Sequence, residues 1–395
     1  MKLILRLLAG IAFGVLCGLF APDLFIRVLI TAKVLISQMI GFTIPLLILF
    51  FVTSGIASLP KNSGKLLGKT VGLAYASTVG AGFLAYFASI QILPSLLSHA
   101  GTLAEPVRKL EPLMTLQIPP VMGVMSALVL AFVFGLGIVS TGSSEMKKLS
   151  DQGRDIIELL LSKCMIPALP FYIAGVFADM TVQGTVFATL KTFSLVLVLV
   201  VVLHWLWLAF QFITTGAIVK RSPLFLLKNM MPAYFTALGT MSSAATLPVT
   251  LRQAQVAGTS KGIANFVVPL CANIHMAGSA ISIVTVACAV MLMSGYAHLP
   301  SLSEMLPFIM MLGITMVAAP GAPGGAVMAA LGLLGTMLGF SEAMLGLQIA
   351  LHLAQDGFGT ACNVTGDGAL AMCVDKMAAG DSVEDAEPEV VEDIA

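Results

Sequence analysis

Small and polar residues interrupt the apolar second half of the chain at four places, beginning with Met241-Ser-Ser-Ala-Ala-Thr-Leu-Pro248. The other three interruptions are Asn273-Ile-His-Met-Ala-Gly-Ser279, Pro320-Gly-Ala-Pro-Gly-Gly325 and Asn363-Val-Thr-Gly-Asp367. Segments of about 15–18 residues flank the first and third interruptions, which is short for crossing a membrane but sufficient for a helical hairpin that enters and returns. A hairpin followed by an interrupted helix is therefore predicted twice in succession. Paired interrupted segments of this kind are typical of the binding site of a secondary transporter.

The composition of the whole chain is that of a membrane protein. Apolar residues make up 58% of the 395 positions and charged residues 10%, and the mean hydropathy is +1.00. With 37 glycines and 19 prolines, the chain is typical of packed, interrupted helices rather than of the alternating strands of a barrel. The net charge is zero and no dense basic cluster is present, so nucleic acid is not expected as a partner. We therefore predict an all-α polytopic protein in a lipid bilayer.

The first half of the chain supplies continuous spans. Apolar stretches long enough to cross about 30 Å of hydrocarbon lie near residues 3–21, 24–58, 66–97, 119–141, 155–179 and 186–219. By the positive-inside rule, the basic residues of alternate loops mark the cytoplasmic side, and we expect both termini there, in the inner cell membrane. These basic residues are Lys2, Arg6, Lys61, Lys65, Lys69, Lys147, Lys148, Arg154, Lys220, Arg221 and Lys228.

Four polar residues form a stripe on the last predicted helix. Asp356, Thr360, Asn363 and Asp367 are spaced four, three and four apart, so they share one helix face. Carboxylates inside a membrane are costly and usually functional, although a structural pairing with a Lys or Arg is the alternative. Glycines surround these acids and leave backbone carbonyls accessible as hard oxygen ligands, while ordinary close helix packing would also explain them. An oxygen-rich site of this kind suits an alkali cation.

The first hairpin tip and two histidines add polar groups. Ser242, Ser243 and Thr246 offer hydroxyls, and a half-helix starting there would present free N–H groups to an anionic carboxylate, although serine also commonly caps helices. His275 and His352 are candidates for protonation, and a neutral, hydrogen-bonded histidine is the commoner outcome. The six cysteines lack CxxC spacing, so neither a disulfide nor a zinc site is expected.

Together, the four interruptions resemble the motifs of the dicarboxylate/amino acid:cation symporter family, which includes glutamate and neutral amino-acid transporters. The resemblance extends over essentially the whole chain and is most specific in residues 242–250, 273–280, 321–326 and 363–367. It implies eight transmembrane helices plus two opposed re-entrant hairpins, built as inverted repeats. It also implies a homotrimer in which each transport domain moves against a fixed scaffold.

The resemblance divides the chain into three parts. Residues 1–221 would hold helices one to six, with one, two, four and five in the scaffold and three and six in the transport domain. Residues 222–379 would hold hairpin one, broken helix seven, hairpin two and helix eight, which form the substrate and cation core. Residues 380–395 are an acidic tail that we expect to be disordered and solvated.

The resemblance also implies roles for individual residues. Asp356 would bind the amino group of the substrate, and Asn363 and the Ser243 region would bind its α-carboxylate. Asp367 would ligate sodium with nearby carbonyls, a second sodium would sit on carbonyls around Asn273 and the second hairpin tip, and residues 320–325 would form the extracellular gate. The implied substrate site comprises Ser242, Ser243, Ser279, Ala322, Pro323, Gly324, Asp356, Gly359, Thr360 and Asn363. The implied metal ligands are Cys271, Asn273, His275, Asn363 and Asp367.

Three positions depart from the glutamate-type pattern. Gly359 stands where that pattern has an arginine, His275 where it has an asparagine, and Ala277 where it has a cation-binding aspartate. The missing arginine argues against a second substrate carboxylate, and the missing aspartate argues for fewer sodium ions. We therefore expect a sodium-coupled importer of a neutral amino acid that works by alternating access, with a proton on His275 as a further candidate coupling ion.

Other classes of function are less consistent with the sequence. A carrier of dicarboxylates or other organic anions should have a buried basic group to balance the extra charge, and none stands at the expected place. A channel without a transport cycle fits paired interrupted hairpins less well than alternating access does. An enzyme is not expected, because no nucleophile–base pair or tight metal set is visible.

Overall fold

The computed structural model describes residues 2–58, 64–98, 108–317, 319, 321 and 323–378. Within these residues every regular element is a helix, so the all-α prediction is confirmed. Ala322, Pro320 and the acidic tail lie outside the described residues.

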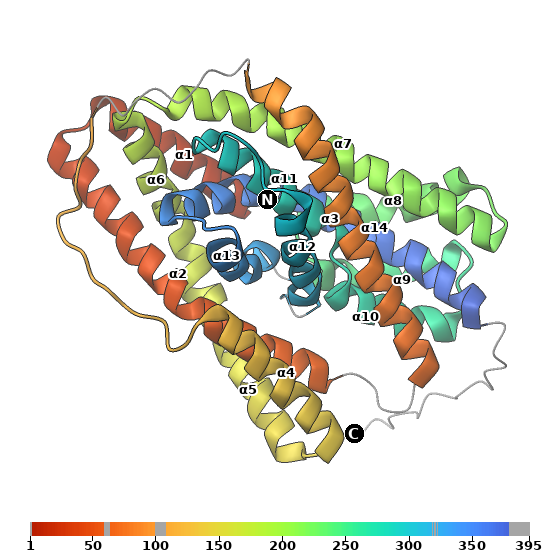
Figure 1. The fold of residues 1–395 in the computed structure, drawn as a ribbon. Helices are drawn as coiled ribbons and strands as arrows, with labels where there is room; N and C mark the ends of the chain where they lie inside the picture. The colour runs from red at the N-terminus through yellow and green to blue at the C-terminus, as the bar shows by residue number, and fades with distance from the viewer. Residues whose placement is uncertain are drawn as a thin grey trace.

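The helices of the first half pack mainly against one another. Helix α1 packs against α6, and α2 packs against α4, α5 and α6. Helix α5 continues into α6 through one π-helical turn, Leu161–Met165, so the two form one long helical stretch. Figure 1 shows α2, α4 and α5 on one side of the molecule and α8, α9 and α14 on the other. The bounds are α1 Lys2–Phe20, α2 Asp23–Ala57, α4 Val124–Thr141, α5 Ser144–Leu160 and α6 Ile166–Val182.

Most of the remaining helices pack around α14, which contacts α3, α7 to α11 and α13. Two helical hairpins are present, α8–α9 and α12–α13, and a break at His275 and Met276 separates α10 from α11. The bounds are α3 Gly64–Ser98, α7 Val186–Val219, α8 Pro223–Thr240, α9 Ser243–Val256, α10 Lys261–Ile274, α11 Ala277–Met293, α12 Leu302–Met316, α13 Gly325–Met337 and α14 Glu342–Ala378.

Three of the four predicted interruptions break helices, but the fourth does not. Helix α14 runs through Asn363-Val-Thr-Gly-Asp367 without a break, so the prediction of an interrupted last helix is wrong. Asn and Asp side chains disrupt a helix when they bond to its own backbone. Here Asn363 and Asp367 bond to residues of the α10–α11 segment instead, and α14 stays intact.

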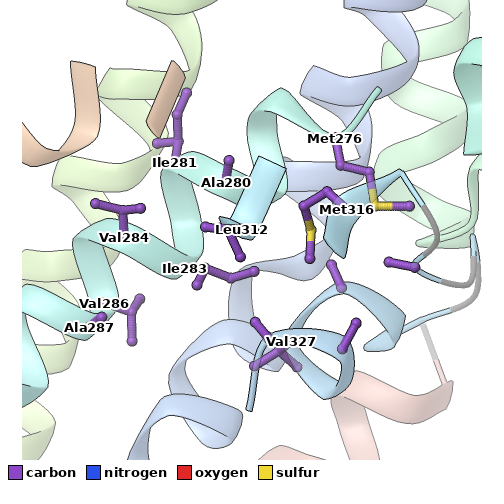
Figure 2. Packing of buried hydrophobic residues seen from close by; sticks show 14 of the residues in the cluster. Met276, Ala280, Ile281, Ile283, Val284, Val286, Ala287, Leu312, Met316 and Val327 are labelled. Atoms are coloured by element: carbon purple, nitrogen blue, oxygen red, sulfur yellow. The ribbon is translucent and has the colours of Figure 1, made fainter. Parts of the chain in front are cut away.

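The lengths and apolarity of the helices fit the membrane protein expected from composition. Within the described residues, five helical stretches are long and apolar enough to cross a membrane, and four shorter helices are apolar as well. The stretch Lys261–Met293 is the most enclosed of the five, since 94% of its most apolar 18-residue segment is buried. Figure 2 shows Ile283 of α11 close to Leu312 of α12, and Met316 of α12 and Val327 of α13 belong to the same apolar cluster. The four other long stretches are Asp23–Ala57, Leu66–Leu97, Ser144–Val182 and Val186–Val219.

Close backbone contact between α11 and α14 places the polar stripe against the helix break. A Cβ atom at Gly278, near the start of α11, would lie 2.4 Å from the carbonyl oxygen of Gly359 on α14. Only a glycine fits at that distance, because real Cβ atoms do not approach oxygen so closely. The start of α11 therefore lies directly on the middle of α14.

Candidate functional site

The polar stripe of α14 is buried where several helix ends meet. Asp356, Thr360, Asn363 and Asp367 are between 0% and 6% exposed. They face the starts of α9, α11 and α13 and the break after α10. Helix ends carry backbone groups without intrahelical partners, so this is a place where side chains of α14 find backbone donors.

Asp356 caps the second arm of the α12–α13 hairpin. Its Oδ2 accepts a hydrogen bond of 2.7 Å from the backbone N–H of Gly324, which has a φ of 76° and directly precedes α13. Glycine adopts this left-handed conformation without steric cost. The carboxylate lies at the positive end of the α13 dipole, where a negative charge is stabilised. The other oxygen, Oδ1, lies 3.5 Å from Nε2 of His352.

Asn363 caps the start of α11. Its Oδ1 accepts hydrogen bonds from the backbone N–H groups of Gly278, at 2.8 Å, and Ser279, at 3.3 Å. Its Nδ2 donates to the hydroxyl of Ser279 at 3.0 Å. An asparagine on another helix thus does the work that an N-cap residue does within a chain. The break between α10 and α11 is stabilised by α14 in this way.

A small cavity separates these two caps. Its volume is about 10 Å³, roughly the room of one water molecule. The structure brings together Ser243, Ser279, Asp356, Thr360 and Asn363 of the predicted substrate site, and it adds residues of the interrupted motifs that were not predicted to line that site. The added lining residues are Met241, Met276, Gly321 and Ala326.

The other predicted substrate residues that the structure describes, Ser242, Pro323, Gly324 and Gly359, lie around this cavity rather than on its wall. Ser242 donates from Oγ to the carbonyl of Gly321 at 2.9 Å, so the tips of the two hairpins touch. Gly359 packs against α11, and a Cβ there would lie 3.4 Å from the hydroxyl of Ser282. Pro323 and Gly324 belong to the α12–α13 tip, where the N–H of Gly324 reaches Asp356.

A second cavity of about 450 Å³ lies on the other side of the hairpin tips. Residues of α2 and α5 form one wall, among them Ser54, Arg154 and Glu158. Ser242, Asn273 and Gly321 contribute to the opposite wall. Because Gly321 lines both cavities, the touching tips form the partition between them.

Asp367 lies in a separate buried polar cluster. Its Oδ1 is 2.8 Å from Nδ1 of His275, whose Nε2 is 2.9 Å from the hydroxyl of Ser77. Gln211 donates to the same hydroxyl at 3.0 Å. Gln211 could have been noticed as a polar residue within an apolar span, whereas Ser77 gave no signal in the sequence.

The predicted metal ligands converge only in part. Asp367 and His275 are in contact, and the carbonyl of Cys271 accepts the backbone N–H of His275 at 2.8 Å. Asn273 points elsewhere, since its Nδ2 donates to the carbonyl of Pro269 and the residue lines the larger cavity. In the part of the chain that the structure describes, no three His, Cys, Asp or Glu side chains gather as a transition-metal site requires.

Interrupted helices around buried carboxylates define the class of helical secondary transporters. Comparison with known proteins narrows the class: the sequence model of the sodium:dicarboxylate symporter family matches residues 3–377, and the chain belongs to this family. The chain is 26% identical over 393 residues to a serine/threonine transporter, SstT, of Acinetobacter baumannii, with 95% of each chain covered. It is 24% identical over 399 residues to the protein of the same name from Acinetobacter baylyi, with 95% of this chain and 97% of that one covered. The protein is therefore a membrane transporter and not an enzyme, and sodium coupling is the general property that its family implies.

The capping role of Asn363 makes a prediction about stability. Asn363→Ala leaves the N–H groups of Gly278 and Ser279 without their acceptor, so we expect stability to fall by about 1–3 kcal/mol. The matched control is Thr365→Val on the same helix, because the buried Thr365 hydroxyl has no hydrogen-bond partner among the described residues. Thermal unfolding of each purified variant in detergent gives its midpoint, which we expect to fall for Asn363→Ala and to stay near the parent value for Thr365→Val. An unchanged midpoint for Asn363→Ala would contradict the capping role.

Proposed function

We propose that the protein is a secondary active symporter that imports a small neutral amino acid, with serine and threonine as first candidates, and couples this import to sodium. The observation that carries the proposal is the charge balance of the small cavity. Asp356 is its acidic lining residue, and none of its described lining residues is basic. A ligand with one ammonium group finds its counter-charge there. The serine/threonine transporters that resemble the chain support this choice of substrate.

The helix start at Ser243 in the cavity wall suits the α-carboxylate of an amino acid. Ser243 is the first residue of α9, so its backbone belongs to a helix start with free N–H groups and a positive dipole end. Asn363 and Ser279 add a side-chain amide and a hydroxyl. The ammonium would then face Asp356 and the carboxylate would face the start of α9.

The size of the cavity requires a moving part. A space of about 10 Å³ is too small for an amino acid, so binding needs the α12–α13 tip to move away from α14. The predicted gate, residues 320–325, includes Gly321 and Gly324, both of which touch the site. We propose that this tip opens to admit the substrate and closes over it, so that the cavity is reached from one side at a time.

We propose the full architecture that the sequence resemblance implies. The hairpin helices α9, α12 and α13 have 14, 15 and 13 residues, fewer than the roughly 20 that a span needs, which supports two re-entrant hairpins beside eight spans. Helices α1, α2 and α4–α6, which contact one another, would form the scaffold. The transport domain would comprise α3 and α7 of residues 1–221 and the core of residues 222–379. In a homotrimer, that domain would move along the scaffold, with both termini in the cytoplasm and the protein in the inner membrane.

Asp367 is the residue that we assign to sodium. Its Oδ2 is buried and has no hydrogen-bond partner among the described residues, and an orphaned carboxylate oxygen fits a hard cation. Asp367 would hold the ion together with backbone carbonyls such as those of Cys271 and Asn363, and the ion would supply the missing positive charge. Since Oδ1 is already in contact with His275 and Ala277 has no carboxylate, we propose fewer sodium ions than in glutamate-type members.

The rival proposal is a carrier of dicarboxylates, which the family's description names, or of other organic anions. A second carboxylate in a buried site needs a basic partner. Arg154 lines the larger cavity on the far side of the hairpin tips, not the small cavity around Asp356. A channel without a transport cycle would not need the partition between the two cavities.

Loss of the carboxylate at position 356 tests the substrate assignment. Asp356→Asn removes the charge-assisted contact to the ammonium, so we expect the affinity for L-serine to fall by about tenfold to a hundredfold. Asp375→Asn near the end of the same helix is the control, because its carboxylate bonds to Ser260 rather than to the site. Isothermal titration in sodium buffer gives both affinities. Equal affinity in Asp356→Asn and the parent protein would refute the assignment.

The reduced sodium count is measured in reconstituted vesicles. We expect one or two sodium ions per substrate from the sodium dependence of initial uptake and the charge moved per substrate, because Ala277 lacks the carboxylate of a third site. Three sodium ions per substrate would contradict this count. Comparing the pH profile of uptake with that of His275→Asn decides whether a proton takes part, since identical profiles would leave sodium as the sole driver.

A further inference from the structure

His352 is a fully buried histidine outside the wall of the small cavity. It lies on α14 with 0% of its surface exposed, and neither ring nitrogen makes a hydrogen bond to any residue that the structure describes. Leaving a buried polar group unpaired destabilises a protein, so such a group calls for an explanation. The explanation has to lie in what stands next to the ring.

A carboxylate, that of Asp356, lies next to the His352 ring. The two residues are four apart on α14, a spacing at which side chains meet on the helix surface. Nε2 lies 3.5 Å from Oδ1, a few tenths of an ångström beyond ordinary hydrogen-bond length. A small rotation of either side chain would therefore form a charge-assisted hydrogen bond from Nε2–H to the carboxylate.

The two oxygens of Asp356 face different parts of the molecule. Oδ2 accepts the N–H of Gly324, which belongs to the proposed gate, whereas Oδ1 faces a residue of the same helix. When the α12–α13 tip moves away to admit a substrate, the N–H of Gly324 leaves with it. His352 stays, because it is fixed to the same rigid helix as Asp356.

We propose that His352 is a positioning residue for the ammonium site: it holds the Asp356 carboxylate in place by donating from Nε2 to Oδ1 while the hairpin tip is open. The inference rests on the proposed function, because it presumes that Asp356 receives an ammonium group. A carboxylate oxygen has more than one lone pair, so Oδ1 can accept from His352 and still face a ligand. The substrate then meets a carboxylate that is already oriented.

The test compares three substitutions of His352 by titrating L-serine into the purified full-length protein in sodium buffer. His352→Leu and His352→Phe remove the donor, and we expect each to weaken binding by about threefold to tenfold. His352→Gln keeps an N–H donor at helical spacing from Asp356 and should bind within about twofold of the parent protein. Gln348→Leu is the matched control: Gln348 is buried one turn earlier on α14 and bonds to the carbonyl of Ile283, so its loss should leave affinity unchanged.

A double-mutant cycle separates positioning from general packing. In the Asp356→Asn background, His352→Leu should change affinity by less than about twofold, because the partner of His352 is already gone. In transport assays the His352→Leu effect should appear in KM and not in the maximal rate. Unchanged affinity in His352→Leu and His352→Phe would overturn the role of His352 but not the proposed function. An equal loss of affinity from His352→Leu in the parent protein and in the Asp356→Asn background would do the same. No binding of L-serine, L-threonine or L-alanine to the parent protein would overturn the proposed function and this inference with it.

Discussion

Backbone groups that are freed where a helix stops inside an apolar interior must find hydrogen-bond partners, and α14 supplies them here. Asn363 accepts the first N–H groups of α11, and Asp356 accepts the N–H that precedes α13. Asp367 is in contact with His275 at the break after α10. The broken helices are thus stabilised by one continuous helix, which explains why α14 carries several buried polar residues.

The same dependence links the proposed ligand sites to the moving parts. Asp356 holds the tip of one hairpin and is also the proposed partner of the substrate ammonium, so a substrate that binds there acts on a contact that keeps the tip in place. Asp367, the proposed cation ligand, contacts His275 at the break between α10 and α11. Asn363 caps the start of α11 on the other side of the same break. A substrate and a cation that bind at opposite ends of the α14 stripe can therefore influence each other through α11 and α14.

Much of this arrangement could be predicted from the sequence, because it follows from local patterns. Composition and span length gave the helical membrane fold, and the spacing of Asp356, Thr360, Asn363 and Asp367 placed them on one face. What could not be predicted depends on contacts between distant segments. The residues at 363–367 disfavour helices and therefore predict an interruption, and only their partners at the α10–α11 break and the start of α11 show why the helix continues.

Ser77 and Gln211 were missed for the same reason, since they reach His275 from α3 and α7 without any shared motif. Ser242 was predicted to line the substrate site, but its hydroxyl donates to the other hairpin tip instead. The spacing of residues in a sequence does not distinguish two positions so close together.

The central claim is that a buried carboxylate selects a substrate by its ammonium group. Sodium-driven uptake into vesicles tests it most directly when L-serine is compared with glycerate, which replaces the amino group by a hydroxyl, and with succinate, a dicarboxylate. The account predicts that an inward sodium gradient concentrates L-serine, and that neither glycerate nor succinate is accumulated or competes. Accumulation of succinate, or competition by glycerate as strong as that by L-serine, would contradict it.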